Sequence, residues 1–257
     1  MLNYKHAFIT GGAGGIGLGI GDALARRGVR VTLADIDVAT LDAVVQERPE
    51  NFAGVQLDVQ CRTRWEAAKL EAEARFGPVD ILVNNAGITM DGVDLADMAP
   101  EVFDRMISVS LTSVFNGIST FAAEMRGRKV GHIVNTASVM GVLPGVPGMG
   151  AYSAAKAGVI AISEALRGEL EPADIGVSVL CPGFVASRLR ETSSRVMPGL
   201  KNQNRKPGRE PMDALTAGEM VVRGIVENWA YIFTHQAYLA SFERRSEEVR
   251  KHFAHGV

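Results

Sequence analysis

Short apolar runs alternate with longer helical patterns along most of the chain, and this alternation limits the folds open to it. Runs typical of buried strands lie at Ala7–Thr10, Val29–Asp35, Phe52–Leu57, Asp80–Asn84, Val130–Thr136 and Val177–Cys181. Helical patterns separate them, from about Gly17 to Gly28, over Val38–Arg48, and near 62–76, 100–126 and 152–171. Buried strands that are each followed by a helix favour parallel pairing with both sheet faces covered. Right-handed crossovers then give a doubly wound α/β sheet.

No linker or repeat interrupts this pattern, so residues 1–257 are predicted to form a single domain. Residues 187–212 have weak periodicity and are expected to form an excursion from the sheet. After it we expect a helix to about Glu227, a strand at Tyr231–Thr234 and a charged amphipathic helix across Gln236–Phe253.

Composition excludes several functional classes. The chain is 47% apolar, which suits a substantial core, and its net charge of −2 gives no overall basic field for nucleic acid. Two cysteines, Cys61 and Cys181, form neither a disulfide framework nor a zinc pattern, and no metal site is expected. The N-terminus lacks a signal-peptide pattern, and no 18-residue apolar run follows, so we expect a cytoplasmic protein without a membrane partner.

A glycine-rich turn, Thr10-Gly-Gly-Ala-Gly-Gly-Ile-Gly17, joins the first strand to the first helix. Glycines there let the backbone approach a pyrophosphate, and a helix N-terminus supplies free N–H groups. Such a turn can also simply connect two elements.

Asp35 ends the second strand, where a carboxylate can accept hydrogen bonds from both hydroxyls of an adenosine ribose. It could instead cap the next helix, although Asp37 is also placed to do so. A carboxylate repels a 2′-phosphate, and neither Ile36 nor Gly14 supplies a cation to bind one. NAD is therefore expected in preference to NADP.

Two further polar segments follow strands. Asp58 and Val59 come after the third strand, and Asn84-Asn-Ala-Gly87 comes after the fourth. Ligands bind at these carboxyl ends in open α/β sheets. A helix cap and an ordinary turn are the structural alternatives.

Tyr152 and Lys156 have the spacing of a proton-transfer pair, because residues four apart share one helical face. A lysine ammonium stabilises a phenolate and lowers a tyrosine pKa. Taken alone, this spacing also occurs by chance in surface helices.

Together these residues make the chain resemble the classical short-chain dehydrogenase/reductase family over essentially its whole length. The matching pieces are Thr10–Gly17, Asp58, Asn84–Gly87, Ser138, Tyr152–Lys156 and Cys181-Pro-Gly183. The resemblance implies a Rossmann-type domain with a mostly parallel seven-stranded sheet, NAD(P) as cofactor, a small-molecule substrate and a homodimer or homotetramer.

The resemblance also assigns roles. Tyr152 would be the general acid/base, Lys156 would bind the nicotinamide ribose, and Ser138 would hold the substrate oxygen. The residues that would contact the cofactor are Gly11, Gly14, Gly15, Ile16, Gly17, Asp35, Asp58, Val59, Asn85, Ala86, Gly87, Tyr152, Lys156, Pro182, Gly183, Val185 and Ser187.

Two positions depart from the family pattern. Ser110 stands where the family commonly has an asparagine that positions a water beside the lysine, so we expect it to retain this proton relay with altered geometry. Ser187 replaces a threonine on the nicotinamide carboxamide and keeps the hydroxyl.

The substrate wall is expected to be apolar, which favours an alcohol or ketone with a hydrophobic body, although these side chains could merely pack the core. Besides Ser138 and Tyr152, the expected substrate contacts are Met140, Leu143, Met149 and Phe184, with Val139 nearby. The 187–212 segment has seven basic residues against two acidic ones. They could attract an anionic substrate through Arg188 and Arg195, or form a solvated lid.

An NAD-dependent secondary alcohol dehydrogenase or ketone reductase is the leading functional hypothesis. An NADP-preferring reductase and a lyase or epimerase are alternatives with the same fold. A dinucleotide-binding regulator that has lost catalysis is a third, supported only by Ser110.

Overall fold

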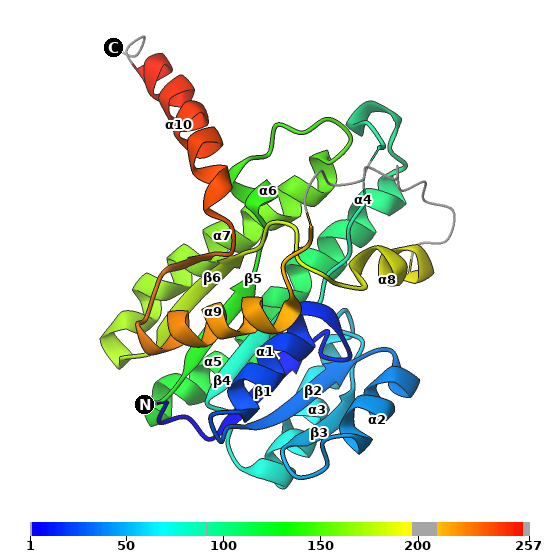
Figure 1. Ribbon diagram of the computed structural model, residues 1–257, viewed down its shortest axis with the longest axis vertical. Helices are drawn as coiled ribbons and strands as arrows, with labels where there is room; N and C mark the ends of the chain where they lie inside the picture. The colour runs from blue at the N-terminus through cyan, green and yellow to red at the C-terminus, as the bar shows by residue number, and fades with distance from the viewer. Residues whose placement is uncertain (1, 91, 197–209, 254–257) are drawn as a thin grey trace.

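A single parallel sheet of seven strands forms the centre of the molecule (Figure 1). The computed structural model describes residues 2–90, 92–196 and 210–253. The strands are β1 (His6–Thr10), β2 (Arg30–Asp35), β3 (Phe52–Gln56), β4 (Ile81–Asn84), β5 (His132–Thr136), β6 (Gly176–Cys181) and β7 (Tyr231–Phe233). Their order is β3-β2-β1-β4-β5-β6-β7, and every pair is parallel. From β1 the strands are added in one direction, to β2 and β3, and from β4 they are added in the opposite direction, to β7. Ligands bind at the point between β1 and β4 where this direction changes in such sheets.

Helices cover both faces of the sheet, as the sequence predicts for strands that are mostly apolar. They are α1 (Gly15–Ala25), α2 (Val38–Gln46), α3 (Arg62–Phe76), α4 (Pro100–Ile107), α5 (Ser113–Arg128), α6 (Val139–Val142), α7 (Gly150–Leu170), α8 (Leu189–Val196), α9 (Ala214–Val226) and α10 (Leu239–Phe253). One core cluster packs Trp65 of α3, Phe121 of α5 and Val159 of α7 on the sheet. The other packs Ile20 of α1 and Val221 of α9 on the opposite face. The predicted doubly wound, seven-stranded fold is confirmed.

The helix expected near 100–126 is present as one helical stretch, Pro100–Arg128, but it contains a π-helical turn that the sequence does not indicate. A π-helical turn at Ser108–Thr112 separates α4 from α5, and it contains the buried Ser110. The whole stretch Pro100–Arg128 is long and apolar enough to cross a membrane by length and composition, but 56% of its most apolar window is buried inside the protein. Core helices of this kind pass the same test, and α5 packs on the sheet through Phe121.

The segment after β6, residues 187–212, is predicted to leave the sheet. It contains a helix and a β-bridge that the weak periodicity of its sequence does not indicate. Residues 189–196 form α8, and Val185 makes a parallel bridge to Met212. The side chain of Ser193 accepts a hydrogen bond from Thr89 N at 2.8 Å, which ties α8 to the loop after β4. The basic residues Lys201, Arg205, Lys206 and Arg209 lie outside the described residues.

The final helix α10 extends away from the body of the molecule (Figure 1). It has no buried residue, and its apolar side chains Leu239, Phe242, Val249 and Phe253 are exposed. The predicted amphipathic pattern is therefore present, but none of its apolar side chains is buried against the described part of the chain.

Candidate active site

The glycine turn brings backbone, not side chains, to the amino end of α1. Gly11 and Gly15 have positive φ angles of 62° and 54°. A Cβ on Gly15 would lie 2.9 Å from the Cβ of Ser187, and a Cβ on Gly17 would collide with the carbonyl of Gly11. No side chain caps α1. Its first N–H groups therefore face the cleft, as an anion-binding turn requires.

Asp35 lies at the carboxyl end of β2, beside this turn. Its carboxylate accepts hydrogen bonds from Ala13 N at 3.0 Å and from Asp37 N at 3.1 Å. Asp37 is the helix cap, since its side chain accepts from Thr40 N at the start of α2. The capping alternative for Asp35 is thus wrong, and its carboxylate is held in place at the cleft.

The segment after β4 joins three strands. The side chain of Asn85 donates to the carbonyls of Thr10 and Gly11 at 3.0 and 3.2 Å, and Thr10 Oγ1 accepts from the N–H groups of Asn85 and Ala86. Asn84–Gly87 is therefore more than an ordinary turn, because it fixes the glycine turn to β4.

Asp58, after β3, accepts a hydrogen bond from Gln60 N. It is not the cap of α3, because the cap residue of that helix is Cys61.

One cleft of about 900 Å³ follows the carboxyl ends of β1 to β6. Its lining contains most of the predicted cofactor residues: Gly11, Gly14, Gly15, Ile16, Asp35, Asp58, Val59, Asn85, Ala86, Gly87, Tyr152, Lys156, Pro182, Gly183, Val185 and Ser187. Gly17 does not line the cleft. It packs closely against the carbonyl of Gly11 in the glycine turn. Three strand spacings, about 14 Å, separate the end of β2 from the end of β5. The cleft has the length, the glycine turn and, in Asp35, the carboxylate that an extended dinucleotide needs.

Ser138, Tyr152 and Lys156 lie together at the β5 end of the cleft. Ser138 follows β5 and accepts from Met140 N at 3.1 Å, and its side chain is close enough to the hydroxyl of Tyr152 to act on the pKa of the tyrosine. Lys156, one turn after Tyr152 on α7, has its Nζ 6.0 Å from the tyrosine ring centre. Thr136 O accepts from Nζ at 2.8 Å and fixes the ammonium. The serine, tyrosine and lysine are all nearly buried, at 6%, 7% and 4% exposure.

Burial is the largest influence on the pKa values of Tyr152 and Lys156. It raises the pKa of Tyr152, and the hydrogen bond from Ser138 opposes that rise. It also lowers the pKa of Lys156 to about 8. The sequence predicts that Lys156 lowers the pKa of Tyr152, but in the cofactor-free protein desolvation outweighs any such effect.

Ser110 lies behind the cleft, not in its wall. Its Oγ accepts from Ile88 N at 3.2 Å and donates to Ile88 O at 3.3 Å. A Cβ on Gly87 would lie 3.7 Å from this oxygen and 3.3 Å from Lys156 Nζ. The hydroxyl therefore lies on the lysine side of Gly87 and holds the backbone that follows Asn85. Its part in a proton relay stays a prediction.

The substrate end of the cleft is largely apolar. Met140, Met149 and Phe184 line it together with Val139 and Val146. Leu143 does not, because it follows the short helix α6 and is half-buried outside the lining. Tyr238, which precedes α10, also lines the cleft. The sequence gives no sign of it, since its position depends on the fold of the C-terminal segment.

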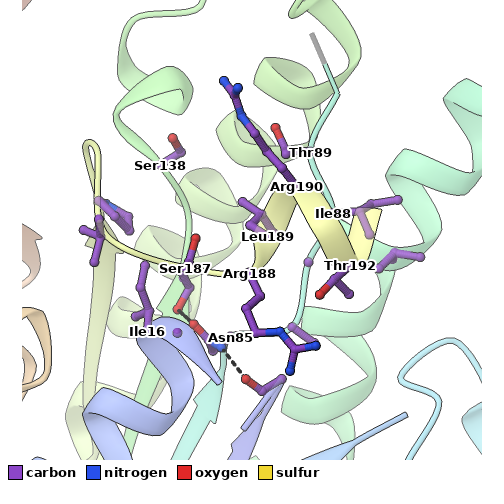
Figure 2. Close-up of a pocket in the computed structure, with 18 of the residues that line it drawn as sticks. Ile16, Asn85, Ile88, Thr89, Ser138, Ser187, Arg188, Leu189, Arg190 and Thr192 are labelled. Carbon is purple, nitrogen blue, oxygen red and sulfur yellow. Dashed lines mark hydrogen bonds between the residues drawn. The ribbon is translucent and has the colours of Figure 1, made fainter. Parts of the chain in front are cut away.

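Arg188 bears on two expectations. Its side chain crosses the glycine turn, and its Nη1 donates to Thr40 Oγ1 at 3.3 Å. Neither Ile36 nor Gly14 supplies a cation, as expected, but Arg188 brings one to the part of the cleft that Asp35 also lines. Figure 2 shows Arg188 and Arg190 pointing in opposite directions, with Arg190 on the side of Thr89 and Ser138. Arg188 therefore lies at the cofactor end and is not placed to meet a substrate carboxylate.

Titratable side chains do not gather as a metal site in the described ranges. No group of three or more His, Cys, Asp or Glu residues there could hold an ion.

Comparison with known proteins gives a consistent result. Residues 5–197 match the family model described as short chain dehydrogenase. An oxidoreductase of Mycobacterium bovis is 40% identical over 193 residues, which cover 74% of this chain and 77% of that protein. The 3-oxoacyl-[acyl-carrier-protein] reductase of Thermotoga maritima is 36% identical over 74% of this chain and 78% of its own.

Solved structures agree over the whole fold. A short-chain dehydrogenase/reductase from Burkholderia phymatum in complex with NAD has a TM-score of 0.88 at 30% identity, covering 98% of this chain and 97% of its own. The apo form of LigD from a Sphingobium strain has a TM-score of 0.82 at 28% identity, covering 96% of both chains. The chain belongs to the short-chain dehydrogenase/reductase family.

Proposed function

We propose that the protein is an NAD-dependent oxidoreductase that interconverts a secondary alcohol and a ketone of partly hydrophobic character. One observation carries the proposal: a single cleft has the glycine turn and Asp35 at one end, and Ser138, Tyr152 and Lys156 at the other. A dinucleotide bound between these ends would bring its reactive ring to the tyrosine hydroxyl.

Tyr152 is the group that moves the proton. When bound, the nicotinamide accepts or gives the hydride. In ketone reduction Tyr152 gives its hydroxyl proton to the carbonyl oxygen, and in alcohol oxidation its phenolate takes that proton back. Ser138 donates to the same oxygen, where negative charge collects in the transition state. Lys156, held by Thr136 O, would hydrogen-bond the ribose of a bound nicotinamide and would keep a positive charge beside the phenolate.

Cofactor and substrate preferences rest on charge and polarity. The carboxylate of Asp35 supports NAD, since it can accept from ribose hydroxyls and repels a 2′-phosphate. The related Burkholderia structure contains NAD, which points the same way. The apolar wall of Met140, Met149 and Phe184 supports a hydrophobic body next to the reacting carbon.

Steady-state turnover tests the proposal. The protein is mixed with NAD or NADP and a panel of secondary alcohols, or with the reduced cofactors and ketones, and absorbance at the reduced nicotinamide band is followed. A 3-oxoacyl thioester belongs in the panel because one relative is a 3-oxoacyl-[acyl-carrier-protein] reductase. We expect turnover with NAD on an apolar secondary alcohol. Conversion of substrate without accumulation of reduced cofactor would contradict a dehydrogenase, as would binding of NAD with no turnover on any substrate.

Assembly into a homodimer or homotetramer is the second part of the proposal. The unpacked apolar side chains of α10 support it, because exposed apolar faces of this kind commonly mark interfaces. Light scattering coupled to size exclusion measures the mass directly. A monomer at micromolar concentration would contradict this part without affecting the proposed reaction.

A further inference from the structure

We infer that Arg188 is a cofactor-binding residue whose guanidinium contacts a phosphate group of the bound dinucleotide. The inference rests on the proposed function, since it takes the cleft to hold a nicotinamide dinucleotide. It assigns to the segment after β6 a role at the opposite end of the cleft from Tyr152.

The position of Arg188 is set by close packing on the glycine turn. A Cβ on Gly15 would lie 2.9 Å from Ser187 Cβ, so the backbone next to Arg188 rests directly on the turn. The Cδ of Arg188 lies 3.5 Å from where a Cβ on Gly14 would be. The arginine thus occupies the space above the turn that a side chain at position 14 would otherwise use. A dinucleotide diphosphate bound at this turn lies within reach of its charge.

The far end of the side chain crosses to α2. Nη1 donates to Thr40 Oγ1 at 3.3 Å, on the first turn after the cap Asp37. The charges of Asp37 and Asp35 both act on the guanidinium. Arg188, Gly14 and Asp35 all line the same cleft. The side chain therefore runs from the turn that would hold the diphosphate to the start of α2, in the same cleft as the acid that would hold the adenosine ribose.

Glu191 orients the guanidinium without using all of its donors. It accepts from Nε at 3.2 Å and from Nη2 at 2.9 Å, one turn later at the start of α8. With Thr40, these bonds use three of the five N–H donors of an arginine. The ion pair is exposed, and such pairs hold their partners weakly. A phosphate is a stronger partner, because it accepts two parallel N–H bonds from a guanidinium.

Two different phosphate groups of a dinucleotide can supply the oxygens that Arg188 contacts. The diphosphate is common to NAD and NADP, whereas the 2′-phosphate next to Asp35 is present in NADP only. The shared chemistry is a charge-assisted N–H···O bond from Arg188. The two sources differ in which cofactor loses affinity when the guanidinium is removed.

Equilibrium binding of NADH and NADPH, followed by their fluorescence, tests the inference without any turnover. We expect Arg188→Gln to weaken binding about 10- to 100-fold, as for loss of one charged hydrogen-bond partner. Equal losses for both dinucleotides identify the diphosphate, and a loss confined to NADPH identifies the 2′-phosphate. Arg188→Lys should recover part of the affinity, because it keeps the charge but not the planar fork.

Arg250→Gln is the matched control. Arg250 forms the same kind of exposed, two-bond pair with Glu247 on α10, through Nε and Nη2. The substitution Arg250→Gln should leave the dissociation constants of NADH and NADPH unchanged. Wild-type-like binding of both dinucleotides by Arg188→Gln overturns the inference and leaves the proposed function intact. A wild-type protein that binds neither dinucleotide contradicts the proposed function itself, and the inference falls with it.

Discussion

Tyr152 has its hydroxyl buried at the end of the cleft, next to Ser138 and one helical turn from Lys156. Replacing it with phenylalanine keeps the ring and its packing but removes the proton that the reaction needs. We expect Tyr152→Phe to lower kcat by about 10²- to 10⁴-fold, the usual range for loss of general acid/base catalysis. Tyr4→Phe is the control, since the Tyr4 hydroxyl bonds to Gly131 O away from the cleft. Full activity in Tyr152→Phe would refute the proposed mechanism.

We expect Lys156 to make the proposed reaction depend on pH. Burial lowers its pKa to about 8, so it carries its charge below that pH and loses it above. The value of kcat/KM for NADH reports groups of the cofactor-free enzyme. In ketone reduction it should be level up to about pH 7.5 and fall as the pH rises through about 8. Lys156→Arg, which stays charged, should lack this fall even if its activity is low. A wild-type profile that stays level to pH 9.5 would show that the lysine charge is not required.

At the residue scale, the sequence predicts which side chains meet but not how they are held. Tyr152, Lys156 and Ser138 come together as expected because a helical turn and a strand end place them. Thr136 O, which fixes the lysine, is a backbone group and leaves no trace in the pattern of side chains. Arg188 reaches Thr40 across 148 positions, and only the folded path of the segment after β6 brings the two together.

At the scale of elements, strands are well predicted and interruptions are not. Parallel strands that are buried on both faces are mostly apolar. For this reason β1 to β6 begin and end within about two residues of their expected limits. The π-helical turn at Ser108–Thr112 keeps the same apolar spacing as the helices on either side, so nothing in the sequence marks it. α6 and α8 have 4 and 8 residues, too short for a periodic pattern to stand out.

Gly117 in helix α5 has no space around it for a larger side chain. A Cβ on Gly117 would overlap Asn84 Oδ1 at the carboxyl end of β4, and Trp65 lies 3.0 Å away on the other side. We expect Gly117→Ala to destabilise the protein by about 1–3 kcal/mol, because overpacking outweighs the better helix propensity of alanine. Urea unfolding followed by circular dichroism measures the change.

Gly127 lies in the same helix and provides the comparison. A Cβ on it would meet nothing within 4 Å. Gly127→Ala should therefore leave the stability unchanged or raise it by up to about 1 kcal/mol. Equal effects of the two alanine substitutions would mean that helix propensity, and not contact with β4, decides the role of Gly117.

At the scale of the whole molecule, the two ends of the sheet have different tasks. The carboxyl ends of the strands form the cleft, which is lined by the glycine turn, Asp35 and the group of Ser138, Tyr152 and Lys156. The amino ends are closed, and two histidines are buried there: His6 in β1 and His132 in β5. His6 bonds to Gly77 O and Thr32, and His132 bonds to Ser178. Both are thus neutral structural residues, and burial lowers the pKa of each.

This arrangement predicts that the fold loses stability in mild acid. The pKa of His132 is lowered to about 3 by burial, with a further effect of the charge on Arg167, whereas in the unfolded chain it returns to about 6.5. Between these values the unfolded state binds a proton that the folded state does not, so stability rises with pH and falls as the pH drops below about 6.5, by up to about 1.4 kcal/mol per pH unit. Urea unfolding at pH 7 and pH 5, above the range where most carboxylates titrate, measures the slope. His132→Gln can keep a hydrogen bond to Ser178 without a titrating ring, and its slope should be shallower than that of the wild type. If the two slopes are the same, His132 does not couple folding to pH.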